Sequence, residues 1–123
     1  MNPKISVIVP CFNQGNYLSE TLESVLKQTL KEWELIIVDD GSTDNSAAIS
    51  KKYSSLDNRI KYVYQKNAGP SAARNKGVAL SQAPLIYFLD GDDWIDSTLL
   101  ESGVNFMNAN SMCKLYYTRA ICF

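Results

Sequence analysis

The stretch ELIIVDDGSTDNS, residues 34–46, carries the pattern on which the fold prediction rests. Its first half is a short run of apolar and β-branched residues that ends at Asp39 and Asp40, which is typical of a buried strand. A turn rich in Gly, Ser, Asp and Asn follows, and apolar residues then recur at helical spacing as far as Leu56. The stretch therefore predicts a strand, a polar turn and a helix, in that order.

The same alternation continues on both sides of this stretch. Further strands are predicted by the apolar runs at residues 5–10, 60–65, 84–90 and 114–123. Further helices are predicted at 16–29, with Asn16 as the N-cap, from Pro70 to Leu80, and after a capping box formed by Thr98 and Glu101. Strands that alternate with helices predict an α/β fold with a mostly parallel sheet flanked by helices.

The composition is that of an ordinary globular protein. The 123 residues are enough for one domain or a piece of one, and 46% of them are hydrophobic. The formal net charge of -1 predicts no basic surface for nucleic acid, and no apolar run approaches the roughly 18 residues that span a bilayer. We therefore expect a globular domain that binds no nucleic acid.

The cysteine and histidine counts limit which metal sites and catalytic groups the chain can have. Three cysteines without clustered spacing predict a reducing, cytoplasmic setting, and peripheral association with the inner face of a membrane stays open. The chain contains no histidine, which argues against a zinc site and excludes Ser-His-Asp and Cys-His catalysis. Any proton transfer would have to use carboxylates, Lys, Tyr or water.

Polar residues follow each of the first four predicted strands. These clusters are Pro10–Asn13, Asp39–Asp44, Asn67–Gly69 and Asp90–Asp93. Because the carboxyl ends of parallel strands meet at one edge of a sheet, we expect the clusters to converge on a ligand-binding crevice. The sequence has neither a G-x-G-x-x-G fingerprint nor a P-loop, so a divalent cation held by aspartates is the candidate partner for phosphate.

The stretch IYFLDGDDWID, residues 86–96, crowds four carboxylates where a predicted strand ends. Like charges at this spacing must stay solvated, be neutralised or bind a cation. An EF-hand calcium loop fits the spacing of the acids in part, but Ile95 stands where that loop needs glycine. A strand also precedes the acids where an EF-hand has a helix, so a calcium loop is disfavoured.

Four motifs in chain order carry a resemblance to a known family. They are SVIVPCFNQGNYLSETLESVLKQT, ELIIVDDGSTDNS, NAGPSAARNKG and YFLDGDDW. Together they resemble the family 2 glycosyltransferases, whose GT-A (Rossmann-like) fold has a nucleotide-binding α/β half followed by an acceptor-binding half. The resemblance runs from about Ile5 to at least Trp94. It implies that residues 1–123 are the nucleotide-sugar-binding part of such a domain, truncated before the acceptor half.

The resemblance implies a set of residues that contact the nucleotide sugar. In the family the acid after the second strand contacts uracil, which falls on Asp40 with Asp39 beside it; alternatively, both only cap the turn. Phe12 would offer uracil a flat face or belong to the core, and Arg74 would meet the diphosphate or form a surface salt bridge. The full set is Pro10, Phe12, Asn13, Asp39, Asp40, Asn67, Gly69, Arg74, Asp90 and Asp92.

The resemblance also implies a metal site in the acidic stretch. One acid of Asp90-Gly91-Asp92 would meet the ribose, and the last acid would bind Mn²⁺ or Mg²⁺ on the diphosphate. Whether Asp92 or Asp93 is the main metal ligand stays open, and a merely solvated turn is the alternative. Asp44 and Asp96 are predicted to cap helices rather than to bind a ligand.

The implied reaction is transfer of a sugar from UDP with inversion, to a glycan or a lipid-linked acceptor. The family's general base is an acid of the second half, so no catalytic residue is expected within this chain. The alternatives are a truncated, non-catalytic module that binds UDP and metal, and, more remotely, a nucleotidyltransferase. A sheet edge left bare by the missing half would favour self-association.

Overall fold

The computed structural model describes residues 2–109, and in this part of the chain the predicted alternation of strands and helices is confirmed. The strands are β1 (Ile5–Cys11), β2 (Trp33–Asp39), β3 (Ile60–Tyr64) and β4 (Leu85–Phe88). The helices are α1 (Gly15–Leu26), α2 (Ser46–Leu56), α3 (Pro70–Leu80) and α4 (Leu99–Ala109). The strand predicted at 114–123 lies outside the described residues.

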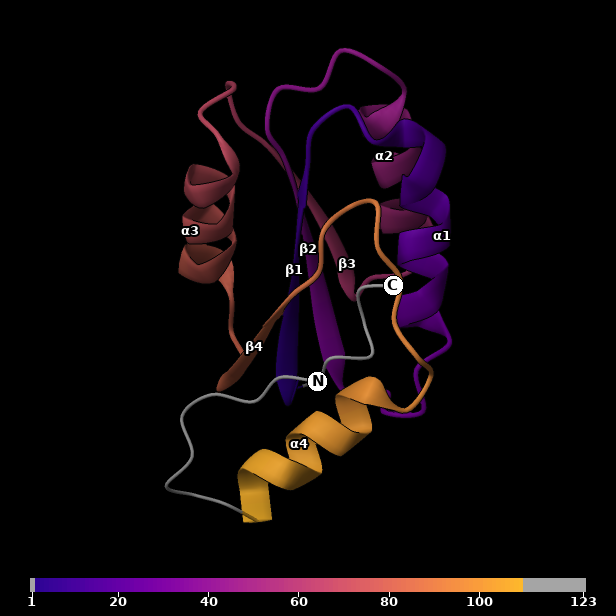
Figure 1. Ribbon diagram of the computed structural model, residues 1–123, viewed down its shortest axis with the longest axis vertical. Helices are drawn as coiled ribbons and strands as arrows, with labels where there is room; N and C mark the ends of the chain where they lie inside the picture. Colours follow the sequence, from indigo (N-terminus) through magenta and orange to yellow (C-terminus); the bar gives the residue numbers. More distant parts are fainter. Residues whose placement is uncertain (1, 110–123) are drawn as a thin grey trace.

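The four strands form one sheet in the order β3-β2-β1-β4, and all three pairings are parallel. Helix α3 lies on one face of the sheet, and α1 and α2 lie on the other (Figure 1). Because helices cover both faces, β1 and β2 are buried along their whole length, which explains why their sequences are mostly apolar rather than alternating. The predicted α/β architecture with a parallel sheet is therefore confirmed.

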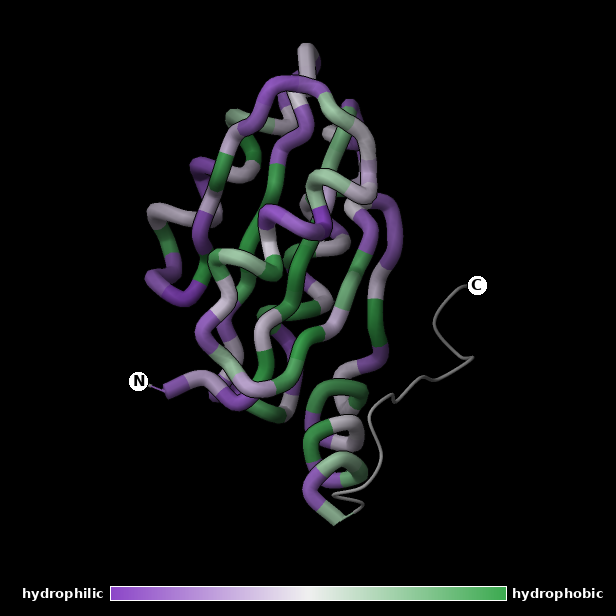
Figure 2. Tube along the Cα trace, turned by 90° about the vertical axis from the view of Figure 1, so that its left-hand side faces the viewer, coloured by the Kyte–Doolittle hydropathy of each residue, from purple (hydrophilic) through white to green (hydrophobic). Residues whose placement is uncertain are grey.

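Successive strand residues point to opposite faces, so the sheet separates two cores. The larger core, against α1, α2 and α4, includes Val7, Val9, Leu35 and Ile37 of the sheet and Leu18, Leu22 and Leu100 of the helices. The smaller core, against α3, consists of Ile8, Ile36, Val38 and Ala73. Helix α3 lies close to the sheet because Gly77 has no side chain, and a Cβ there would overlap with Ile8. Figure 2 shows hydrophobic strands running through the interior and hydrophilic residues in the loops at one end.

The start of α1 differs from the prediction that Asn16 is its N-cap. The helix begins at Gly15, and its first N–H donates to Asp44 Oδ2 at 2.9 Å. The other oxygen, Asp44 Oδ1, accepts the N–H of Ser46, the first residue of α2, at 2.9 Å. Burial acts to raise the pKa of Asp44, but these hydrogen bonds outweigh it and lower the pKa. One carboxylate thus caps two helices. Asp44 was predicted to cap a helix, but its contact with the start of α1 was not predicted.

The two outer strands of the described sheet each have one neighbour. Within residues 2–109, β3 pairs only with β2 and β4 pairs only with β1. Ile86 and Phe88 of β4 are 37% and 44% exposed, so apolar surface lies beside the outer edge of this strand. None of the described helices is both long and apolar enough to cross a membrane.

Candidate functional site

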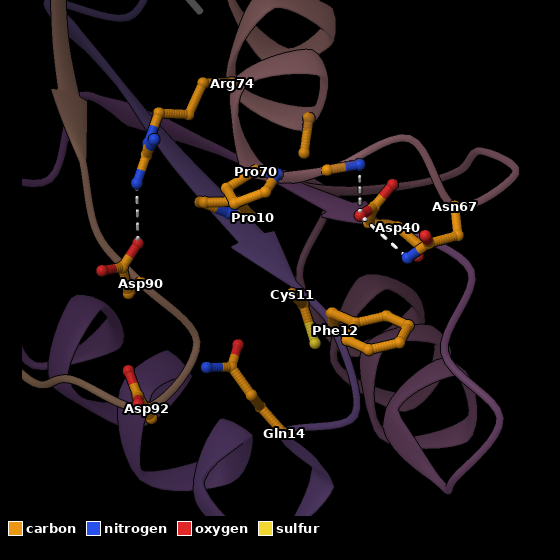
Figure 3. A pocket seen from close by; sticks show the side chains of 12 residues that line it. Pro10, Cys11, Phe12, Gln14, Asp40, Asn67, Pro70, Arg74, Asp90 and Asp92 are labelled. Atoms are coloured by element: carbon orange, nitrogen blue, oxygen red, sulfur yellow. Dashed lines mark hydrogen bonds and ion pairs between the residues drawn. The ribbon is translucent and has the colours of Figure 1, made fainter.

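A crevice of about 550 Å³ opens at the carboxyl ends of β1, β2 and β4, beside the first turns of α3 (Figure 3). Its lining residues are Pro10, Cys11, Phe12, Gln14, Asp40, Asn67, Gly69, Pro70, Ala73, Arg74, Asp90 and Asp92. All four polar clusters that follow the predicted strands contribute to this lining or to the turn beside it. The convergence expected from the parallel sheet is therefore observed.

The end of β1 supplies the apolar wall of the crevice. Phe12 is 48% exposed, which excludes the alternative that it belongs to the core. Cys11 is 1% exposed, and burial raises the pKa of its thiol. The thiol is therefore a small packed group rather than a nucleophile, and Phe12 is the aromatic surface that a flat ligand would meet.

Asp39 and Asp40 point to opposite faces of the sheet because they are neighbours at the end of one strand. Asp39 is 1% exposed and does not line the crevice; its Oδ1 accepts the N–H of Ser42 at 2.8 Å and its Oδ2 accepts the hydroxyl of Tyr62 at 2.7 Å. The second contact, together with burial, raises the pKa of Tyr62. Of the two acids, only Asp40 reaches the crevice.

Asp40 fastens the loop between β3 and α3. Its carboxylate accepts four hydrogen bonds, from Gln65 Nε2 (2.8 Å), Ala68 N (2.7 Å), Asn67 Nδ2 (3.2 Å) and Gly69 N (3.0 Å). Burial acts to raise its pKa, but these donors outweigh it, so the pKa is lowered. Because a carboxylate offers about four lone-pair sites, the loop already occupies the acceptor capacity of Asp40.

Asn13 also lies outside the crevice lining, in a clamp between the first two loops. Its backbone has φ 52, and its Oδ1 accepts the N–H of Thr43 at 2.8 Å. Its own N–H donates to Ser42 Oγ at 2.9 Å. The short side chain of asparagine tolerates this left-handed backbone. Asn13 therefore ties the loop after β1 to the loop after β2.

Arg74 faces Asp90 across the crevice, with Nη2 and Oδ1 3.6 Å apart (Figure 3). Their side chains are 39% and 49% exposed. An ion pair this open to water contributes at most about 1 kcal/mol. The salt bridge expected as the alternative for Arg74 thus exists, but it lies within the crevice, where the guanidinium can also meet a bound anion.

The turn after β4 gathers three acids, which we call the acidic turn (Asp90–Asp93). One oxygen from each of Asp90, Asp92 and Asp93 lies within 4.8 Å of the others. Charges this close repel by about 1 kcal/mol per pair even at the dielectric constant of water. Burial, followed by the charges of Asp92 and Asp90, raises the pKa of Asp93. Converging carboxylate oxygens are the ligands that Mn²⁺ and Mg²⁺ prefer, so the residues fit a divalent cation.

The sequence prediction covered most of this site and missed part of it. The metal prediction of Asp92 and Asp93 did not include Asp90, although the spacing of the three acids was visible. Gln14 was missed because nothing in a polar loop residue marks it as lining a crevice. A Cβ on Gly91 would lie 2.6 Å from Gln14 Oε1, which shows how closely the acidic turn approaches this side chain.

This chain is similar in sequence to known glycosyltransferases. The glycosyltransferases GlyA and GlyG of Streptococcus pneumoniae serotype 4 are 46% and 42% identical to this chain over 102 and 103 residues. Each alignment covers 83% of this chain, but only 15% of GlyA and 34% of GlyG. The chain therefore spans a minor part of these relatives.

Solved structures show the same fold. The crystal structure of S. aureus TarS 1–349 in complex with UDP matches with a TM-score of 0.80 and 32% identity, over 88% of this chain and 33% of that one. The same protein in complex with UDP-GlcNAc matches with a TM-score of 0.78. The fold is the GT-A fold of these proteins. The family model described as Glycosyl transferase family 2 matches residues 6–118, and the chain belongs to this family.

Proposed function

We propose that this chain is the donor-binding part of an inverting glycosyltransferase that uses a UDP-sugar and a divalent metal ion. The observation that carries the proposal is the crevice itself, which places an exposed aromatic ring, a guanidinium and the carboxylates of Asp90 and Asp92 around one space. The carboxylate of Asp93 is not part of the lining but converges on these two. These groups match, in turn, a base, a diphosphate and the cation that bridges carboxylate to phosphate. TarS, which binds UDP and UDP-GlcNAc, supports UDP as the nucleotide.

Each residue has a role set by its position. Phe12 stacks on the uracil, and Arg74 leaves its weak pair with Asp90 to meet the diphosphate. Asp92 and Asp93 hold the metal with Asp90 next to them, facing the ribose. When bound, the metal supplies positive charge that stabilises the departing diphosphate. For Asp40 to contact uracil as predicted, one N–H of the loop after β3 must release the carboxylate. In the structure as it stands, the role of Asp40 is to fix that loop.

The remaining steps are not assigned to the described residues. The general base and the acceptor site, for a glycan or a lipid-linked acceptor, are expected in the second half of the fold. Residues 2–109 are therefore assigned donor binding and not proton transfer. A cytoplasmic location, where UDP-sugars would be met, is part of this proposal.

The test is a calorimetric titration of UDP into the protein, first with Mn²⁺ and then with EDTA. We expect binding that depends on Mn²⁺ and that is weakened by Asp92→Asn and by Arg74→Ala. Asp96→Asn is the matched control, because Asp96 is an exposed acid in the same stretch but stands outside the cluster of three. Equal binding in EDTA would contradict the metal role, and binding without sugar transfer by the whole protein would favour the non-catalytic module.

A further inference from the structure

The chain that leaves the acidic turn runs back along α1 (Figure 1), and buried side chains of α1 and of the segment just after it hold it there. Thr21 is 1% exposed, and its Oγ1 lies 3.0 Å from Gly91 O and 2.5 Å from Asp93 O. Just past the end of α1, Gln28 is fully buried. Its Nε2 donates to Asp96 O at 2.6 Å, and its Oε1 accepts the N–H of Leu100 at 3.0 Å.

These contacts act on the backbone on each side of the proposed metal ligands. The Gly91 carbonyl belongs to the peptide group that precedes Asp92, and the Asp93 carbonyl belongs to the one that follows Asp93. A hydroxyl has one proton, and Tyr17 O of α1 also lies within reach of Thr21 Oγ1, at 3.3 Å. The two carbonyls of the turn are the nearer acceptors, so the proton is directed mainly to them. With both peptide groups oriented toward one atom, the directions in which the side chains of Asp92 and Asp93 leave the backbone are fixed.

The carboxylates have little else to orient them. Within residues 2–109, no hydrogen bond reaches the side-chain oxygens of Asp92 or Asp93, while their charges repel one another. Apart from the exposed ion pair of Asp90 with Arg74, the other bonds of the turn run from backbone to backbone, Gly91 N to Pro10 O at 3.3 Å and Asp93 N to Asp90 O at 3.0 Å. Among the described residues, the hydroxyl of Thr21 is thus the buried side-chain group that holds the backbone of the turn.

We propose that Thr21 is a positioning residue that holds the acidic turn in the shape that binds the metal, and that Gln28 fixes the exit of the turn. This inference rests on the proposed function, because it takes Asp90, Asp92 and Asp93 as the metal site. Without the hydroxyl, the carboxylates would occupy a wider range of positions, and metal binding would have to restrict them at a cost in affinity. Partners that orient metal ligands without touching the metal typically account for a factor of about 10 to 100 in affinity.

The first test is titration of Mn²⁺ alone into the protein, with free Mn²⁺ measured by electron paramagnetic resonance. Thr21→Val keeps the shape of the side chain and removes the donor, and it should weaken Mn²⁺ binding about tenfold. Thr21→Ser restores the hydroxyl and should restore the affinity. The matched control is Ser50→Ala, which removes an equally buried hydroxyl whose bond to Ser46 O stays within α2; its Mn²⁺ affinity should equal that of the unmodified protein.

The second test needs no metal and separates this inference from the proposed function. In Thr21→Val, amide hydrogen exchange should become faster at Gly91 and Asp93 and stay unchanged in the β1–β2 ladder. Equal acceleration throughout the molecule, or none in the turn, would overturn the positioning role even if the protein binds Mn²⁺. Local acceleration in a protein that binds no Mn²⁺ would instead uphold the positioning of the turn and overturn the metal site.

Gln28→Met provides a second variant, should Thr21→Val fold poorly. It keeps the length of the side chain but removes the bonds to Asp96 O and Leu100 N. We expect faster exchange at Leu100 and weaker Mn²⁺ binding, in the same direction as Thr21→Val. Unchanged Mn²⁺ affinity together with unchanged exchange at Gly91 and Asp93 would show that Gln28 does not help to set the shape of the turn.

Discussion

Asp40 and Asp93 both follow strands of the same sheet, yet the structure treats their charges in opposite ways. Asp40 accepts four hydrogen bonds, and its pKa is lowered. Asp93 has no donor to its side chain within residues 2–109; burial and the charges of Asp92 and Asp90 raise its pKa. The difference shows which of the two charges stabilises the fold. Asp40 stabilises the chain, whereas Asp93 repels the neighbouring charges of the acidic turn.

The largest effect should come from removing the charge of Asp40. Asp40→Asn places an amide NH2 group among four donors, so at least one of them loses its acceptor inside the protein. We expect the free energy of unfolding in urea to fall by about 3 kcal/mol. In Asp92→Asn, which leaves no buried donor unpaired, it should change by no more than about 0.5 kcal/mol. Similar losses of unfolding free energy in the two variants would show that the charge of Asp40 contributes no more to stability than that of Asp92.

The glycines beside the two acids sharpen the comparison. Gly41 has φ +79, and a Cβ there would lie 2.9 Å from the backbone N of Asn67, in the loop that Asp40 fastens. Gly41→Ala should therefore cost about 1–2 kcal/mol of unfolding free energy, measured by the same urea titration. Gly91 is not among the glycines with positive φ, and its Cβ would meet the flexible end of Gln14. Gly91→Ala should cost clearly less, and an equal cost would show that the acidic turn is as tightly built as the loop after β3.

The sequence predicted the fold well because its signals are local. The apolar runs of β1 and β2 and the proline at the start of α3 each depend on a few neighbouring residues. The parallel arrangement then followed from alternation alone, and it brought the strand ends together. The alternation of side chains along a strand could also have shown that Asp39 and Asp40 cannot both face the crevice, and the prediction did not use it.

The features that the sequence did not reveal depend on partners far along the chain. Asp44 caps α1 from the neighbouring loop, and Thr21 contacts Asp93, 72 positions away. Within α1, Thr21 is one polar residue on a mostly apolar face, and nothing in the helical pattern indicates which part of the chain its hydroxyl contacts. Such contacts depend on how the helices and strands pack against one another, so they cannot be predicted from the spacing of residues within one element.

The smallest effect should appear in how stability depends on pH. A raised pKa means that folded Asp93 holds its proton more tightly than the unfolded chain does, so its charge destabilises the fold at neutral pH. The stability gained by Asp93→Asn should fade as the pH falls through this raised pKa toward 3.8, the ordinary value. For Asp40 the pKa is lowered, so the stability lost in Asp40→Asn should persist at 3.8 and fade only below it.

We would measure the free energy of unfolding by urea titration for Asp93→Asn, Asp40→Asn and the unmodified protein, between pH about 7 and about 3. The difference for Asp93→Asn should fade at a higher pH than the difference for Asp40→Asn. The control is Asp96→Asn, an acid outside the cluster, whose stability should follow the unmodified protein. If the differences for Asp40 and Asp93 fade over the same range of pH, their surroundings do not differ in the way described.

The sheet order β3-β2-β1-β4 bears on how the chain folds as it is synthesised. Ile5 of β1 pairs with Trp33 of β2, but also with Leu85 of β4, which is made much later. Closing a longer loop costs more entropy, and pairings between distant segments form slowly. We therefore expect β1, β2 and β3 to assemble first, while β4 and the acidic turn join the sheet last. The ability to bind a metal ion would then arise only when folding of this part of the chain is complete.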